Sequence, residues 1–172
     1  MEIKSIKKID RARELVRNRQ DLFKCPICSG QMFIDDHKNL ACNNNHSFDF
    51  SKKGYLNLLT AANTPVYSRE LFAARHQVCL AGFYDPLIDK LVEIVSAHFP
   101  ANKTVLDAGC GEGSHIYDIY RKTQGSSEHL FAGADISKDS INIAAGNNAD
   151  IIWCVADLSK LPFLDKTFDI VL

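Results

Sequence analysis

Four residues in the first third of the chain have the types and spacing of metal ligands. Cys25 and Cys28 form one close pair, and Cys42 and His46 form a second, so the pattern is C-x2-C-x13-C-x3-H. Two such pairs, each on a tight turn, can converge on one tetrahedral zinc ion. Because four protein ligands leave no position for a reactive water, the spacing predicts a structural zinc site. Metal binding would supply much of the folding energy of a module this small.

A redox role for these thiols is the main alternative, and no role at all is the other. A thioredoxin-type Cys-x-x-Cys needs a βαβ setting, and the residues around Cys25 do not predict one. His37 lies in a polar stretch, where we expect an exposed side chain rather than a ligand. The remaining cysteines, Cys79, Cys110 and Cys154, lie among apolar or glycine-rich residues, which is typical of structural thiols.

A glycine-rich loop in the second half of the chain has the features of a ligand-binding turn. A short buried strand predicted at 103–107 leads into the sequence AGCGEG at 108–113, and a helix is predicted from about Ser114. Glycines let the backbone turn tightly and approach a ligand, and a helix N-terminus attracts polar or anionic groups. The spacing G-x-G-x-G differs from the G-x-G-x-x-G of NAD enzymes, which disfavours an oxidoreductase.

Three aspartates are predicted to lie where successive strands end. Asp107 closes the first apolar run, Asp135 follows the run 130–134, and Asp157 follows the run 151–155. In a parallel sheet built from βα units, ligands bind at the carboxyl ends of the strands. Asp135 lies about 20 residues beyond the glycine-rich loop, where an acidic residue can accept hydrogen bonds from ribose hydroxyls. Each aspartate alone could be a helix cap, but the set favours a nucleotide-type ligand.

The elements that must position these residues divide the chain into four segments. Residues 1–23 are predicted as an N-terminal helical extension, and residues 24–60 as a zinc-binding module of short strands and loops. Residues 61–69 are predicted as a linker, and residues 70–172 alternate helix and strand. The fold class is therefore α/β, with a small zinc-binding module ahead of a parallel sheet.

Helix boundaries in the last segment are predicted from residues that typically start or end helices. A helix over 70–81 should be capped by Gly82, and a helix over 137–145 by Gly146. Asp85 and Pro86 suit the start of a helix that ends near residue 98. A fourth strand is predicted to begin at Thr167.

The composition is that of an ordinary globular protein. Hydrophobic residues make up 46% of the chain and the net charge is −1, which excludes a disordered tail, a collagen-like repeat and a coiled-coil rod. No apolar run suits a membrane span, and the N-terminus lacks the apolar core of a secretory signal. We therefore expect a cytoplasmic protein with no membrane partner. The first 90 residues hold 14 basic and 10 acidic side chains, which suits a solvated helical face or a polyanionic partner.

Taken together, the motifs resemble those of a known family. The run 105–113 resembles the first motif of class I S-adenosylmethionine-dependent methyltransferases, whose Rossmann-like domain has a parallel sheet. The runs 133–137 and 156–163 resemble the second and third motifs. With the zinc module, KGYLNLL at 53–59 and Ala74-Arg75, the chain from about residue 23 is similar to the bacterial large-subunit ribosomal RNA guanine-N1 methyltransferase A family. The N-terminal extension resembles its Gram-positive branch, which includes macrolide-resistance enzymes.

The resemblance implies transfer of a methyl group from S-adenosylmethionine to N1 of a guanine in a hairpin of 23S ribosomal RNA. The zinc module would recognise the hairpin. Asp135 would bind the ribose, Ile136 would pack on adenine, and Asp157 with Leu158 would meet the adenine edge. The full set of implied cofactor-binding residues is Tyr84, Asp107, Gly109, Gly111, Glu112, Asp135, Ile136, Asp157 and Leu158. His76 stands where a second arginine is common in the family.

The end of the sequence sets a further expectation. A complete domain of this class has a seven-stranded sheet, and this chain stops within or just after the fourth strand. We therefore expect a partial methyltransferase domain, without a catalytic base that can be named. Its open strand edge favours self-association, as in a homodimer. The alternative function is a non-enzymatic, zinc-dependent RNA-binding fragment with a vestigial cofactor domain.

Overall fold

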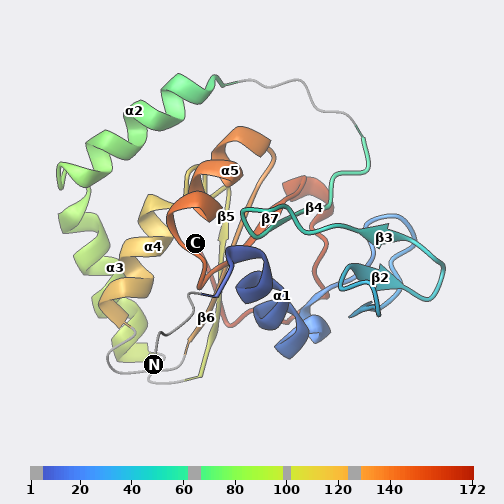
Figure 1. Cartoon of the computed structure of the whole chain (residues 1–172). Coiled ribbons are helices and arrows are strands. Elements are labelled where there is room, and N and C mark those ends of the chain that lie inside the picture. Colours follow the sequence, from blue (N-terminus) through green and yellow to red (C-terminus); the bar gives the residue numbers. More distant parts are fainter. Residues whose placement is uncertain (1–5, 62–66, 99–101, 124–128) are drawn as a thin grey trace, which may run out of the picture.

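The computed structural model describes residues 6–61, 67–98, 102–123 and 129–172, and it contains two sheets (Figure 1). The small sheet is antiparallel, in the order β1-β2-β3, and the large sheet has the order β4-β7-β6-β5-β8. Every pairing in the large sheet is parallel. The strands are β1 (Met32–Ile34), β2 (Leu40–Cys42), β3 (Ser47–Phe48), β4 (Tyr55–Asn57), β5 (Thr104–Ala108), β6 (Leu130–Asp135), β7 (Ile152–Val155) and β8 (Ile170–Val171).

The helices mostly begin and end where the sequence predicts. Ser68 and Ser137 cap two helices by accepting hydrogen bonds from backbone N–H groups three residues ahead. Gly82 follows its helix with a positive φ of 78°, as a cap requires. The prediction for Gly146 is wrong, because that helix continues through it to Asn147. The helices are α1 (Lys8–Asn18), α2 (Arg69–Leu80), α3 (Asp85–His98), α4 (Ser114–Thr123) and α5 (Lys138–Asn147), with short 3-10 turns η1 (Gln20–Leu22) and η2 (Leu158–Lys160).

Helices cover one face of the large sheet. Alternate residues of its strands point to this face and pack against the apolar stripes of α3, α4 and α5. Figure 1 shows these helices on one side of the sheet, with the small sheet and α1 on the other side. The residues of this first core include Ile88, Val105, Ile116, Ile119, Phe131, Ile141, Trp153 and Val155.

The opposite face is covered by α1 and the predicted zinc module. A single buried cluster joins α1 and the small sheet to the strands β5, β6 and β7, so the module and the large sheet share a hydrophobic core. Residues 22–24 also pair with the segment after Asp157, since the Phe23 and Phe163 rings lie 5.3 Å apart and the N–H of Lys24 donates to the Pro162 oxygen. The residues of this second core include Ala12, Val16, Phe23, Met32, Leu40, Leu106, Ala132 and Cys154.

Strand β4 lies in a place that the sequence does not predict. It belongs by sequence to the stretch 24–60, yet it forms an edge of the large sheet and pairs with β7, with Tyr55 opposite Trp153 and Asn57 opposite Val155. The chain therefore leaves the small sheet and joins the large one before the linker begins. At the other edge, β8 pairs with β5 alone within the described part of the chain.

Close packing explains two glycines beside the predicted cofactor loop. A Cβ atom at Gly113 would lie 2.5 Å from the Trp153 ring, and a Cβ atom at Gly133 would lie equally close. The indole is held by its own N–H, which donates to the Asn148 oxygen at 2.9 Å. The loop can therefore rest on the sheet only without a side chain at these positions. Among the described helices, none is long and apolar enough to cross a membrane.

Candidate functional site

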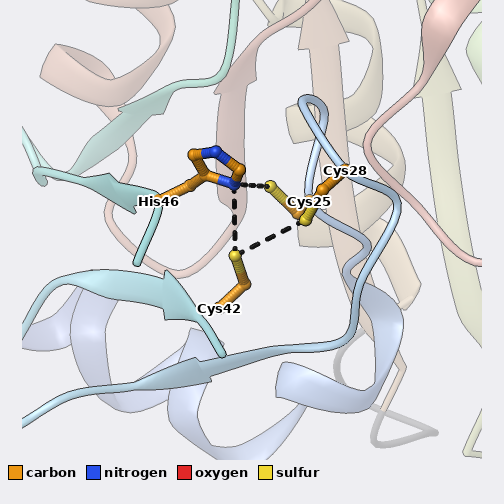
Figure 2. A group of neighbouring side chains, drawn as sticks. All are labelled: Cys25, Cys28, Cys42 and His46. Atoms are coloured by element: carbon orange, nitrogen blue, oxygen red, sulfur yellow. Dashed lines mark hydrogen bonds between the residues drawn. The ribbon is translucent and has the colours of Figure 1, made fainter. Parts of the chain in front are cut away.

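The four predicted zinc ligands converge on one point between the turn at 25–28 and the small sheet (Figure 2). The Nδ1 atom of His46 lies 3.5 Å from the Cys25 sulfur and 3.4 Å from the Cys42 sulfur, and the Cys28 and Cys42 sulfurs are 3.7 Å apart. A tetrahedral zinc ion with sulfur ligands at about 2.3 Å separates neighbouring ligand atoms by about 3.8 Å. The arrangement therefore matches the size of a zinc site.

Local hydrogen bonds prepare the sulfurs for a metal. The N–H of Gly30 and the side chain of Asn44 lower the pKa of Cys28 to about 6, so this thiol is largely ionised at neutral pH. Burial raises the pKa of Cys25, which a bound cation would offset. His37 is exposed and lies outside the cluster. The residues present therefore fit a closed, structural zinc site.

The glycine-rich loop bends around the carboxyl end of β6. Gly109 and Gly111 adopt positive φ angles of 97° and 57°, and the N–H of Gly109 donates to the Ala134 oxygen at 2.8 Å. The N–H of Gly111 donates to Oδ2 of Asp135 at 3.0 Å, and the N–H of Ser137 donates to Oδ1 at 2.7 Å. Each carboxylate oxygen has a second lone pair. Asp135 is thus oriented by the backbone and can still accept a bond from a ribose hydroxyl.

Two further acidic groups lie close to Asp135. Burial, followed by the negative charges of Asp135 and Glu112, raises the pKa of Asp107 to about 6. The side chain of Glu112 is only 2% exposed, and its Oε2 atom has no hydrogen-bond partner within the described residues. Its nearest cation is Arg75, whose Nε lies 3.8 Å away. A buried acidic cluster of this kind is suited to a cationic ligand.

Helix α2 brings Arg75 to the loop, a residue that the sequence did not assign to the site. Its guanidinium would lie 3.7–3.8 Å from a Cβ atom at Gly111. Neighbouring His76 holds the helix in place, because its Nδ1 lies 2.8 Å from the Ser114 hydroxyl and its Nε2 lies 3.4 Å from the Asn147 amide nitrogen. His76 therefore acts in packing α2 onto α4 and α5.

The other predicted residues lie on both sides of the loop. The Tyr84 ring packs against the His115 ring at 4.7 Å, beside the first turn of α4. Ile136 and Leu158 are exposed beyond the ends of β6 and β7, and Asp157 begins η2 by accepting two bonds from Ser159 at 2.8 Å. The predicted cofactor residues thus lie around the glycine-rich loop, beside the first turn of α4, and beyond the ends of β6 and β7.

Comparisons with known proteins match both parts of the chain. The family of RlmA N-terminal zinc ribbons matches residues 23–64, and a methyltransferase-domain family matches residues 100–172. A Bacillus subtilis protein, YxjB, whose name places it among the 23S rRNA guanine-N1 methyltransferases, is 39% identical over 155 residues, covering 88% of this chain and 55% of its own length. The chain belongs to this methyltransferase family. We refer below to its N-terminal module, residues 23–64, as the zinc ribbon.

Other relatives agree with this assignment. The 23S rRNA (guanine(748)-N(1))-methyltransferase of Streptomyces fradiae is 31% identical over 150 residues, covering 83% of this chain and 51% of that protein. The crystal structure of a Methanococcus maripaludis protein named as an S-adenosyl-L-methionine-dependent methyltransferase has a TM-score of 0.51 at 19% identity, covering 66% of this chain and 52% of that one. This second likeness shows the class I fold alone. The chain spans about half the length of its curated relatives.

The cofactors of this family fit the residues present. One zinc ion suits the Cys3His cluster, and S-adenosylmethionine suits the carboxyl edge, where a buried acidic cluster can receive the ammonium group of its amino acid end. The clearest local sign is the buried Oε2 of Glu112, which accepts no hydrogen bond within the described residues and faces Arg75 Nε only at 3.8 Å, so it can still accept one from a ligand. The sequence predicts the loop and the aspartates as parts of the site, whereas it predicts 70–81 only as a helix, and this helix, α2 (Arg69–Leu80), brings Arg75 to the loop.

Proposed function

We propose that this chain carries the RNA-recognising and cofactor-binding parts of an S-adenosylmethionine-dependent methyltransferase that acts on N1 of a guanine in a hairpin of 23S rRNA. The observation that supports this most is the joining of two sites through one core. A zinc ribbon that suits RNA recognition packs on the same sheet whose strand ends form the cofactor edge. The names of the two curated relatives point to the same substrate.

The residues of this chain would bind the cofactor and orient its methyl group. S-adenosylmethionine supplies a methyl group that is already electrophilic because it is attached to a sulfonium. Asp135 would hold the ribose, and the acidic cluster of Asp107 and Glu112 would receive the amino acid end. Holding the methyl group at one place beside the target base makes the transfer effectively unimolecular. This positioning is the contribution to the reaction rate that this half of the protein can make.

A basic groove supports an RNA partner. It has a volume of about 630 Å³ and lies between the turn of the zinc ribbon and the segment 158–168. Lys24, Lys160 and Lys166 line it together with one acidic residue, Asp165. Lysines along a groove attract the phosphate backbone, and single-stranded loops are the usual targets of specific RNA readers. We infer that a hairpin lies along this groove with its guanine turned toward the cofactor edge.

Two further parts of the proposal concern assembly and location. Self-association as a homodimer stays a prediction. A substrate in ribosomal RNA is in keeping with a cytoplasmic location.

The test is native mass spectrometry with S-adenosylhomocysteine, on the parent chain and on Asp135→Asn. The parent should bind one zinc ion and one ligand. Asp135→Asn should keep its zinc and lose cofactor affinity by about tenfold or more, because a carboxylate that accepts ribose hydroxyls is replaced by an amide. Asp139→Asn, on the exposed first turn of α5, is the matched control and should bind like the parent.

Two results would contradict the proposal. Equal cofactor affinity in Asp135→Asn and the parent would remove Asp135 from the site. A parent chain that takes up zinc and an RNA hairpin but no cofactor would favour the non-enzymatic RNA-binding alternative.

A further inference from the structure

The last strand of the zinc ribbon leads directly into the cofactor edge. Strand β4 runs parallel to β7 at the edge of the sheet, and the N–H of Leu58 continues the ladder by donating to the Val155 oxygen at 2.9 Å. The N–H of Leu59 then donates to Oδ1 of Asn57 at 3.3 Å, which turns the chain at the end of the strand. Residues 58–61 therefore lie beside the segment that carries Asp157.

A cleft of about 170 Å³ separates these two segments. One wall consists of residues 58–61, in which Leu58 is buried, Leu59 is half-buried, and Thr60 and Ala61 are exposed. The other wall comes from the ends of β6 and β7. The complete lining is Leu58, Leu59, Thr60, Ala61, Ile136, Asp157 and Lys160.

The chemistry of this lining suits a flat heteroaromatic ring with a polar edge. Ile136 and the two leucines offer apolar surface, which favours contact with a ring face. Both hydrogen bonds from Ser159 go to Oδ1 of Asp157, so Oδ2 is available to accept from an exocyclic amine. Adenine has both features, and the cleft lies beyond the carboxylate of Asp135 that we assign to the ribose.

We propose that Leu58, Leu59, Thr60 and Ala61, which the zinc ribbon contributes, are cofactor-positioning residues. They form the second wall of the cleft in which the family resemblance places the adenine ring against Ile136 and Asp157. This inference rests on the proposed function, because it assumes that the carboxyl edge binds that cofactor. The wall of the cleft is held by β4 on one side and by the shared core on the other. The zinc ribbon thus has two roles, one toward RNA and one toward the cofactor.

The experiment places a large side chain in the cleft, at positions that the zinc ribbon contributes. Isothermal titration with S-adenosylhomocysteine is carried out on the zinc-loaded parent chain, on Ala61→Trp and on Thr60→Trp. Both positions are exposed, so a large side chain there does not disturb the core. Ala97→Trp is the matched control, since Ala97 is also exposed but lies near the end of α3, close to where β5 begins. Zinc content and the melting temperature are measured for all four proteins.

The expected result is a loss of affinity of about tenfold or more in both cleft variants, with zinc content and melting temperature unchanged and with Ala97→Trp binding like the parent. Parent-like affinity in both cleft variants would overturn the inference while leaving the proposed cofactor site intact. An equal loss in Ala97→Trp would also overturn it, because the effect would not be specific to the cleft. A parent chain that fails to bind S-adenosylhomocysteine would instead overturn the proposed function, and this inference with it.

Discussion

The zinc site and the cofactor edge are built in opposite ways. The zinc ligands come from 22 consecutive residues, and their four donor atoms lie within 4.8 Å of one another. The proposed cofactor edge collects groups from α2, from the ends of β5, β6 and β7, and from the segment after β4. A closed site needs only two tight turns, whereas an open edge needs a complete sheet beneath it.

The zinc site and the large sheet nevertheless share one hydrophobic core. The buried cysteines 25 and 42 belong to the same cluster as Leu106 and Ala132 in the middle of the large sheet. The zinc ribbon also contributes β4, which pairs with β7 at the edge of the large sheet. The two sites therefore differ in construction but share one hydrophobic core, and three changes test the regions separately and together.

The largest effect is expected from Cys42→Ser. Removing one thiolate should lower the zinc content well below one ion per chain and destabilise the fold by about 3 kcal/mol or more, which is a fall in melting temperature of roughly 10 °C. Because the ribbon and the sheet share a core, affinity for S-adenosylhomocysteine should fall as well. Zinc analysis, thermal unfolding and titration measure the three quantities.

Asn43→Ser is the control for this change, since Asn43 is the exposed neighbour of the same ligand. It should keep its zinc and its melting temperature. A zinc-free Cys42→Ser protein with the parent's cofactor affinity would show that the two regions are independent.

An intermediate effect is expected from pH. The pKa of Asp107 is raised to about 6 by burial and by neighbouring negative charges, so the free protein holds a proton there below this pH. An ammonium group placed beside Asp107 favours the ionised form and releases that proton, so affinity for S-adenosylhomocysteine, which carries such a group, should fall as the pH drops from 7 to 5, by up to about tenfold per unit below pH 6. Titration of the parent and of Asp107→Asn checks this, because the variant should lose the pH dependence.

The same shift has the opposite sign for the stability of the free protein. A carboxyl whose pKa is raised in the folded state binds more protons there than in the unfolded chain. Between the ordinary pKa of aspartate, about 4, and the raised value of about 6, its contribution to the free energy of unfolding therefore decreases as the pH rises. An affinity that stays constant from pH 7 to 5 would place the ligand away from Asp107.

The smallest effect is expected from Lys166→Gln in the basic groove. Loss of one exposed cation should weaken binding of a 23S rRNA hairpin by a few fold and reduce the slope of log affinity against log salt by up to about one. Lys90→Gln is the control, because Lys90 lies on exposed α3 and pairs with Glu93 at 2.8 Å. Filter-binding measurements over a range of salt concentrations give both quantities. Identical slopes for the two variants would place the RNA outside the groove.

Much of the fold could be predicted from the sequence because its signals are local. The apolar runs that end at Asp107 and Asp135 and precede Asp157 became neighbouring parallel strands, and the loop at 109–113 became the turn between β5 and α4. Helix caps were predicted correctly at Gly82, where the chain needs a positive φ, and wrongly at Gly146, where it does not. Glycine within a helix is tolerated when the flanking residues continue the pattern.

The sequence alone determined the zinc ligands and the set of glycines and aspartates, because their types and spacing are sufficient to name their chemistry. Only the tertiary structure decided where β4 pairs, that Arg75 covers the loop, and that Glu112 is buried with a carboxylate oxygen that accepts no hydrogen bond within the described residues. Parallel pairing across about 100 residues leaves no local pattern in a three-residue strand. Burial and the charges around a carboxylate likewise depend on which segments meet in space. The cleft beside Ala61 forms because two segments that are distant in the sequence meet there, so no local sequence pattern predicts it.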